Sequence, residues 1–291
     1  MFEGVGVHTG QPAHLIVEPA PPGSGLVFIR TDLPGHPSVP VTPASVLPDL
    51  CQRCTILDSN GVQISTGEHL LSALMGLGIQ DARLLLNGRE VPFLDGSSHQ
   101  FCTQLLSASR FASDQDPGAY QIRFSNPFLY ESGTARFLVL PSEGFRVTYI
   151  YTSRQPLLRF QTATWDGRDY AKEIAPARTF GFLDELGPLL SAGLVKGASL
   201  NNSVVFGKRH LLNNGLRFPD EPARHKILDF LGDIAPLQGQ LQGWVFCVRT
   251  GHRTNAEFVR ALHEAIHDPN SGVTRIPSDQ APAATDSTTL G

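Results

Sequence analysis

The sequence predicts an α+β fold, and three observations lead to that prediction. Strand-like and helix-like segments are mixed along the chain rather than alternating regularly, so no parallel βαβ sheet is expected. The chain has 291 residues, of which 41% are hydrophobic and 17% charged, enough to bury the core of one large domain or of two. A polar stretch at 113–120 contains the sequence Asp-Pro-Gly and separates two apolar regions. We take this stretch as the break between a first domain, residues 1–115, and a second, residues 120–267.

Short strands are expected where β-branched and aromatic residues cluster between turn residues. Segments of this kind lie on both sides of the polar stretch, at 14–19, 25–30, 82–88, 145–151 and 243–249. Together with the helices described next, they predict sheets packed against helices.

Three helices are expected from the spacing of their apolar residues. Residues 68–78 place apolar side chains on one face and finish in two glycines, which end the helix. Residues 222–234 begin with a proline and carry apolar residues at helical spacing. Residues 254–267 form the third helix, with Thr254 as its expected cap. After it, residues 268–291 are rich in Pro, Ser, Thr and Ala and are expected to form a poorly ordered tail.

The composition indicates a soluble protein of the cytoplasm. Lys and Arg number 23 against 27 Asp and Glu, a net charge of −4, whereas a nucleic-acid-binding protein normally has a basic surface. No apolar run approaches the roughly 20 residues that cross a bilayer, and the start of the sequence shows no secretory signal. Four cysteines are too few for a disulfide scaffold of this size, which fits a reducing compartment. We expect no nucleic-acid partner and no membrane-spanning segment; the composition does not set the oligomeric state, for which we favour a monomer.

His225 and Asp229 are the first candidates for chemistry. They are four residues apart on an expected helix, so their side chains share one face and can hold one metal ion. Asp233, four residues further on, can orient a neighbouring imidazole. Among ten histidines and 27 acidic residues, about one such spacing is expected by chance. In isolation, an ordinary intrahelical salt bridge is therefore the favoured explanation.

A second candidate pair, Glu68 and His69, opens the expected helix 68–78. His69 can supply the third protein ligand of a catalytic zinc, whose fourth position is usually taken by water. Glu68, beside the metal but not bound to it, can take the proton from that water. The alternative is helix-start electrostatics, which favours an acid in the first turn but does not explain the histidine.

The remaining candidates come from two short segments. His252 follows a strand end and a glycine, where loops often present catalytic side chains, and it can donate a proton to a leaving group with Asp233 as its partner. Thr179 can offer its hydroxyl to an oxyanion, while Phe180 and Phe182 can line an apolar passage. The alternatives are a turn histidine near a helix start and, for the two aromatics, buried strand packing, which the residues alone favour.

Six stretches of the sequence match one enzyme family in the same order. They are GVGVHTG (4–10), STGEHLLSALMGLG (65–78), EVPFLDGSS (90–98), ARTFGF (177–182), GLRFPDEPARHKILDFLGDI (215–234) and TGHRTN (250–255). On these stretches the sequence resembles the UDP-3-O-acyl-N-acetylglucosamine deacetylases, the zinc enzymes of lipid A biosynthesis. Six collinear stretches are far more specific than one His-x-x-x-Asp pair, so the structural alternatives above lose most of their weight.

The resemblance implies a role for each matching residue. The implied metal ligands are His69, His225 and Asp229. The implied catalytic residues are Glu68 as general base, His252 as acid, Asp233 as its support and Thr179 at the oxyanion. The implied substrate-binding residues are Lys226 at the nucleotide diphosphate, together with Arg249, Phe180, Phe182 and His8. A set of two histidines and an aspartate also suits Fe(II), so iron is the alternative to zinc.

The resemblance also implies a reaction and an architecture. The reaction is the hydrolysis of the acetamido group on a UDP-linked, 3-O-acylated glucosamine, which releases acetate. The implied fold has two domains, each a sheet layered on helices, with the active site at their junction. The implied partner is the acylated UDP-sugar, and any membrane contact would be peripheral, through the acyl chain of that substrate.

The sequence departs from the family pattern at its start and at residues 145–161, and the second of these departures keeps other functions open. The family has a further strand before the first matching stretch, whereas Met1 stands three residues ahead of it, so either the chain start or an edge strand differs. Residues 145–161 lack the usual Asn/Asp-His-Pro stretch and retain only Pro156. The alternatives are a deacetylase of another N-acetylated sugar or glycolipid, and a binding protein of the same fold. The retention of Glu68, His69, His225, Asp229 and His252 together speaks against the latter, because a binding protein needs no general base beside a metal.

Overall fold

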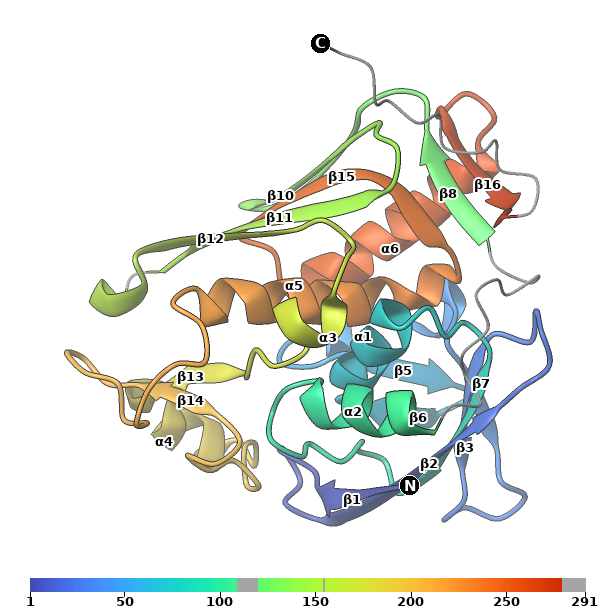
Figure 1. Cartoon of the computed structure of the whole chain (residues 1–291). Helices are drawn as coiled ribbons and strands as arrows, with labels where there is room; N and C mark the ends of the chain where they lie inside the picture. The colour runs from blue at the N-terminus through green and yellow to red at the C-terminus, as the bar shows by residue number, and fades with distance from the viewer. Residues whose placement is uncertain (109–119, 154, 279–291) are drawn as a thin grey trace.

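The computed structural model describes residues 1–108, 120–153 and 155–278, and it stacks them as sheet, helices, helices and sheet (Figure 1). The sheet of the first half and the sheet of the second half lie on the outside, and the helices of the two halves meet in the middle. One cluster of buried apolar residues crosses all the layers, from Phe28 and Leu84 through Leu70 and Leu228 to Val245. The α+β class predicted from the sequence is confirmed.

The first sheet has five strands in the order β1-β2-β7-β3-β4. Its strands are β1 (Phe2–Val5), β2 (Pro12–Pro19), β3 (Leu26–Arg30), β4 (Ser38–Pro40) and β7 (Ala82–Asn87). Neighbours are antiparallel except β3 and β7, which run parallel. Buried and exposed residues alternate along β3 and β7, because one face packs on helices and the other faces outward. The three strands expected in this half are confirmed.

The helices of the first half are α1 (Glu68–Gly76) and α2 (His99–Ser107). A small hairpin of β5 (Ile56–Ser59) and β6 (Val62–Ser65) leads into α1. Its turn is Asn60-Gly61, and both residues have positive φ, as a two-residue hairpin requires. Two 3₁₀ turns, Pro43–Ser45 and Pro48–Leu50, precede the hairpin. The expected helix 68–78 is confirmed and ends at the first of its two glycines.

The second sheet has seven strands, with β12-β11-β15-β10-β9 in sequence across the sheet and β8 joining β15 to β16. Its strands are β8 (Tyr120–Phe124), β9 (Phe128–Ser132), β10 (Ala135–Leu140), β11 (Phe145–Thr152), β12 (Phe160–Trp165), β15 (Gln240–Val248) and β16 (Val273–Pro277). The expected strands 145–151 and 243–249 are confirmed as β11 and β15, which pair in parallel at the centre.

Two long helices, α5 (Glu221–Ile234) and α6 (His252–His267), cover the inner face of this sheet (Figure 1). Every residue of α5 from Ile227 to Ile234 is buried, because α5 packs on the second sheet and also on α1. The 3₁₀ turn Ala235–Leu237 follows α5.

The expected start of the last helix was wrong. α6 begins at His252 with Gly251 as its cap, and Thr254 lies one turn inside, where its hydroxyl accepts the backbone N–H of Gly251. His252 is therefore the first residue of a helix and not a loop residue. The hydroxyl of Thr254 favours this earlier start because it pairs a backbone donor that would otherwise be left free.

A smaller unit lies at one end of the layers, in the lower left of Figure 1. It consists of β13 (Phe180–Phe182) and β14 (Val204–Phe206), which pair in parallel, and α4 (Leu183–Ser191). A separate apolar cluster of Leu158, Val204 and Phe206 holds it together. The short helix α3 (Tyr170–Glu173) lies between the second sheet and this unit in the chain, and the 3₁₀ turn Pro156–Leu158 between β11 and β12 contributes Leu158 to its apolar cluster.

The two expectations at the domain break and the tail have different outcomes. Residues 113–119 lie outside the described residues, and Tyr120 already belongs to β8. The prediction of a disordered tail was wrong for its first part, because Val273–Pro277 forms β16 and pairs antiparallel with β8. Residues 279–291 lie outside the described residues.

Among the helices that the structure describes, we find none with the length and apolar character needed to cross a membrane.

The two middle layers touch most closely at Gly232 of α5. A Cβ atom placed on Gly232 would lie 2.0 Å from the carbonyl oxygen of Glu68, the first residue of α1. Only glycine permits this approach, so Gly232 sets the spacing between α1 and α5. All residues of α1 from Glu68 to Leu74 are buried by this packing.

Substitution of Gly232 by alanine should push α1 and α5 apart. Although alanine favours helix formation, overpacking against the backbone of Glu68 should lower the free energy of unfolding by about 1–3 kcal/mol. Denaturant unfolding of Gly232→Ala measures this. The control is Gly187→Ala on the exposed face of α4, where a new Cβ meets nothing within 4 Å. Equal stability of the Gly232 variant and the control would show that the close contact does not limit packing.

Candidate active site and metal centre

A cavity of about 360 Å³ opens between the two halves, and most of the predicted site residues line it. The first half contributes His8, Glu68 and His69, and the second half contributes Thr179, Phe180, Phe182, His225, Lys226, Asp229 and His252. Asp233 lies directly behind His252 and is buried. Residues predicted from separate stretches of the sequence therefore meet at one place.

His69, His225 and Asp229 form the centre of this cavity. One ligand atom from each lies within 4.8 Å of the others, and all three residues are buried. Nε2 of His225 is 3.2 Å and Nε2 of His69 is 3.7 Å from Oδ1 of Asp229. Across the described residues, this is the group of three or more His, Cys, Asp or Glu side chains with the geometry of a metal site.

The chemistry of these three residues fits a metal ion. Oδ1 of Asp229 is buried without a hydrogen-bond partner, which is costly unless a cation satisfies it. Burial lowers the pKa of His69 to about 3, helped by the neighbouring His225, and burial also lowers the pKa of His225. Burial alone would raise the pKa of Asp229, but His225 and Lys226 hold it well below its usual range. Two neutral imidazoles and a carboxylate facing one point are the donors that a divalent transition metal prefers.

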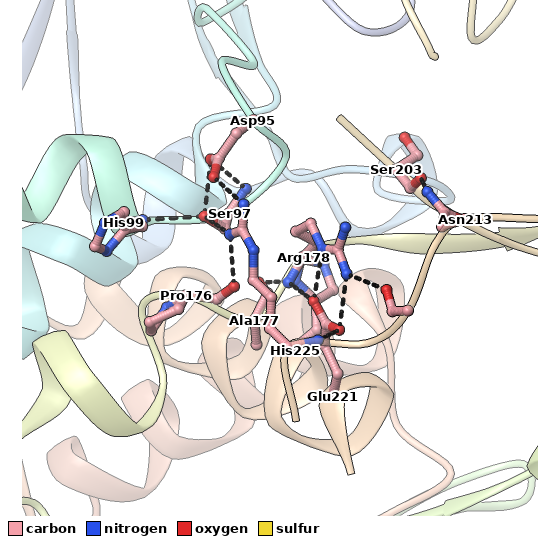
Figure 2. Close-up of polar contacts among 12 residues, drawn as sticks. Asp95, Ser97, His99, Pro176, Ala177, Arg178, Ser203, Asn213, Glu221 and His225 are labelled. Carbon is pink, nitrogen blue, oxygen red and sulfur yellow. Dashed lines mark hydrogen bonds and ion pairs between the residues drawn. The ribbon is translucent and has the colours of Figure 1, made fainter. Parts of the chain in front are cut away.

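The imidazole of His225 is oriented by the segment before β13. Its Nδ1 donates to the carbonyl oxygen of Ala177 at 3.0 Å, which leaves Nε2 free to face Asp229. Figure 2 shows the neighbouring pair of Arg178 and Glu221, whose backbone and side-chain contacts fix this segment. Glu221 is fully buried at the start of α5 and accepts both the N–H and Nε of Arg178.

A second ion pair fastens the same segment to the first half of the protein. Arg217 donates to the carbonyl oxygen of Pro176 and, 2.9 Å away, to Oδ2 of Asp95. Asp95 in turn accepts the hydroxyl of Ser97, as Figure 2 shows. The segment that orients His225 is thus fixed to both halves.

Glu68 lies beside the metal-binding group at the start of α1. Its side chain is buried, and Oε2 accepts the backbone N–H of Thr55 at 3.1 Å. Burial raises the pKa of Glu68 to about 7, although the charge of His252 opposes the shift. A carboxyl group with a pKa near neutrality can both accept and return a proton, which is the requirement for a general base.

His252 and Asp233 form a pair on the other side of the cavity. Nδ1 of His252 is 3.0 Å from Oδ2 and 3.2 Å from Oδ1 of Asp233, and Nε2 faces Asp229 at 3.8 Å. Burial opposes the charged imidazole, but Asp233 and Asp229 outweigh it and raise the pKa of His252 to about 9. His252 is therefore suited to act as a proton donor.

Thr179 reaches the cavity through a close contact between the halves. Its backbone N–H donates to the carbonyl oxygen of Gly96 at 2.7 Å. Gly96 has a φ of +75°, and a Cβ there would lie 1.9 Å from the carbonyl oxygen of Asn202. Thr179 is thereby positioned among the residues that line the cavity.

Lys226 is already paired in the structure. Its Nζ donates to Oδ2 of Asp229 at 2.7 Å and lies 5.6 Å from the ring centre of Phe180. The ammonium thus sits at the edge of the metal centre, on the side that faces β13. Arg249 is exposed and is not among the residues that line the cavity, so its role in substrate binding stays a prediction.

One arm of the cavity is apolar. Phe180 and Phe182 are half-buried on β13, pack against Phe206 and also line the cavity. Strand packing is thus observed for these aromatics, while their role in lining a passage for substrate stays a prediction. The apolar arm continues along α4 and the following loop, where the lining side chains are Leu186, Leu189, Val195 and Ala198.

His8 is held at the cavity by a buried carboxylate that the sequence did not single out. Oε1 of Glu90 accepts the backbone N–H of His8 at 2.8 Å and the hydroxyl of Thr66 at 3.0 Å. Oε2 accepts the N–H and the hydroxyl of Thr9. Glu90 thus joins the first matching stretch to the start of α1.

Other supporting residues also escaped the sequence reasoning. Thr55 and Asn255 both donate to Asp233, and Glu221 holds the segment that orients His225. Asn255 and Glu221 lie in stretches that match the family, which is the one signal available for them. Thr55 lies outside all six stretches, and the residues it contacts are 13 and 178 positions away.

Loss of His225 should remove the metal. We expect His225→Ala to retain its fold but to bind less than a tenth of an equivalent of metal, because one of three ligands and its oriented imidazole are gone. Metal analysis of the purified protein measures this, with circular dichroism as the check on folding. His263→Ala, an exposed histidine of α6, is the matched control. Full metal occupancy in His225→Ala would contradict the ligand assignment.

Comparisons with known proteins show the family of this chain. The family model described as LpxC, UDP-3-O-acyl N-acetylglycosamine deacetylase, matches residues 1–264. The chain is 37% identical to the UDP-3-O-acyl-N-acetylglucosamine deacetylase of Myxococcus xanthus (strain DK1622), over 92% of this chain and 84% of that protein. It is 38% identical to the enzyme of the same name from Saccharophagus degradans, over 87% and 84%, and 36% identical to that from Bdellovibrio bacteriovorus, over 91% and 87%. The chain therefore belongs to the UDP-3-O-acyl N-acetylglycosamine deacetylase family.

Proposed function

We propose that this protein hydrolyses the N-acetyl group of UDP-3-O-(3-hydroxyacyl)-N-acetylglucosamine and releases acetate, as a cytoplasmic enzyme of lipid A biosynthesis. Family membership supports the reaction. The observation that carries the proposal is the meeting of Glu68, His252 and the three-residue metal-binding group in one buried cavity with an apolar arm. The division into domains at residues 115–120, with this cavity at their junction, is part of the proposal.

We propose zinc as the metal, held by His69, His225 and Asp229. When bound, zinc supplies Lewis-acid activation of a water molecule and of the amide carbonyl. The donor set supports zinc, while Fe(II) is the alternative that the same ligands would accept.

The protein's own residues move the protons. Glu68 takes a proton from the attacking water, because its carboxylate is buried beside the metal-binding group and its pKa is near neutrality. The hydroxyl of Thr179 donates to the developing oxyanion. His252, charged through its pairing with Asp233, then gives a proton to the departing amine, or Glu68 returns the one it took.

The remaining lining residues would bind the rest of the substrate. Lys226 presents its ammonium on the side of β13, where it would contact the diphosphate while it pairs with Asp229. His8 also lines the cavity, where it would contact the sugar. The apolar arm past Phe180 and Phe182 would enclose the acyl chain.

Replacement of Glu68 by glutamine should abolish most of the activity without removing the metal. The amide cannot accept a proton, so kcat should fall about 10²–10⁴-fold, the usual contribution of a general base. Acetate release and metal content are measured on the same preparation. Glu264→Gln, an exposed glutamate of α6, is the control. A Glu68 variant with nearly normal kcat would remove Glu68 from this role.

The acyl chain should be required for efficient turnover. About four methylenes buried in the apolar arm, at about 0.8 kcal/mol each, correspond to a difference in kcat/KM on the order of 10²-fold. We expect at least this preference for the acylated UDP-sugar over UDP-N-acetylglucosamine in an acetate-release assay. Equal kcat/KM for both would instead favour a deacetylase of another N-acetylated sugar.

A further inference from the structure

We propose that Thr55 is a positioning residue. It fixes the general base Glu68 of the first half relative to the Asp233–His252 pair of the second half. This inference rests on the roles proposed above for Glu68 and His252. Thr55 is not among the described residues that line the cavity or form the metal-binding group. It acts through the carboxylates of Glu68 and Asp233, which it contacts.

Thr55 donates two hydrogen bonds, one to each carboxylate. Its backbone N–H donates to Oε2 of Glu68 at 3.1 Å, and its hydroxyl donates to Oδ1 of Asp233 in a short contact. The residue is 3% exposed, so neither donor has water as an easy replacement. Loss of either contact would leave a buried polar group unpaired.

The position of Thr55 is itself fixed. Its carbonyl oxygen accepts the N–H of Thr66 at 3.1 Å, and the next residue begins β5, whose Ile56 pairs with Ser65 of β6. Thr55 therefore directly precedes the first strand of the β5–β6 hairpin, and Glu68 follows its second strand at the start of α1. This arrangement gives Thr55 the rigidity that a residue needs in order to position others.

On the side of Glu68, the contact limits the freedom of the carboxylate. Oε2 is held by the N–H of Thr55, so Oε1 is the oxygen left to take a proton. Rotation of the side chain would break this hydrogen bond and leave the backbone N–H of the buried Thr55 without its partner. The base is thereby kept in one orientation before the substrate arrives.

Asp233 receives hydrogen bonds from both halves of the protein. Among the described residues, Thr55 is the one donor to Asp233 that belongs to the first half. Asn255 donates to Oδ2 at 2.7 Å, but Asn255 lies on α6 together with His252. The hydroxyl of Thr55 comes from the first half and fixes Oδ1. Asp233 is thus held between both halves, and the imidazole of His252 follows its orientation.

The charges of the two carboxylates explain why a donor is needed between them. Glu68 and Asp233 are both buried carboxylates that Thr55 contacts at the same time. A residue that donates to both stabilises their charges without neutralising either group. Threonine does so with its backbone N–H on one side and its hydroxyl on the other.

The test removes the hydroxyl while keeping the shape and the backbone N–H. We expect Thr55→Val to lower kcat at least about tenfold, within the range up to about 10²-fold that small misplacements of reacting groups produce. KM and metal content should stay within twofold of the unaltered enzyme. Thr55→Ser, which restores the hydroxyl, should recover kcat to within about threefold.

Thr148→Val is the matched control for the loss of a buried threonine hydroxyl. Thr148 lies on β11, is 8% exposed and pairs with Thr164 in the second sheet, and it does not line the cavity. Its loss should lower thermal stability to a similar degree as Thr55→Val while kcat stays normal. Comparable kcat losses in the two valine variants would overturn the proposal, because the effect would then follow stability.

A double-mutant cycle tests whether Thr55 acts through Asp233. In an Asp233→Asn background, where the pairing with His252 is already weakened, Thr55→Val should lower kcat no more than about twofold further. Losses that multiply fully would show independent action and overturn the proposal. If Thr55→Val does not fold, a folded Thr55→Ser with a kcat loss above tenfold would overturn it equally, because the hydroxyl is present there.

The experiment separates this inference from the proposed function. If Glu68→Gln and His252→Ala both retain normal kcat, the proposed mechanism fails and the role of Thr55 fails with it. If those variants lose activity while Thr55→Val remains normal, the proposed function stands and the positioning role alone is overturned. Normal kcat for Thr55→Ser together with a loss for Thr55→Val supports both.

Discussion

The close contact of α1 with α5 is the constraint on which the rest of the structure depends. Neither helix holds a complete site: α1 carries Glu68 and His69, and α5 carries the other two ligands. Because Gly232 has no side chain, the backbone of α5 reaches the carbonyl of Glu68, and the two incomplete sets meet. The sheets outside both helices give them apolar faces to pack on, so the contact is held from both sides.

This placement puts an unusual density of charge inside the protein. Glu68, Asp229 and Asp233 are all buried, and each is paired with a donor: Glu68 and Asp233 with donors from other segments of the chain, and Asp229 with Lys226 of the same helix. Burial raises the pKa of Glu68, and the pairing of His252 with Asp233 raises the pKa of His252. A base and an acid therefore coexist near neutral pH. Burial shifts the pKa values of these groups, and the hydrogen-bond donors around them offset part of the cost of burying their charges.

Sequence reasoning succeeded where the relevant interactions are local. The pairing of His225 with Asp229 follows from one turn of helix, and the expected helices are confirmed at α1, α5 and, with a shifted start, α6. It failed at one short capping contact and at one contact between distant segments. The start of α6 depends on Thr254 accepting the N–H of Gly251, three residues earlier, whereas β16 exists because it pairs with β8, far back in the chain. Hydrophobic periodicity describes neither kind of contact.

The sequence by itself determined the fold class, the family and the residues able to bind a metal, since these depend on local spacing and on the order of short stretches. The tertiary structure alone decided how the groups are oriented and charged. Thr55, Glu90 and Glu221 carry no catalytic pattern, yet each fixes a site residue across many positions of sequence. Burial and the approach of charges from other elements set the pKa values, and these depend on distances in space that a linear sequence does not contain.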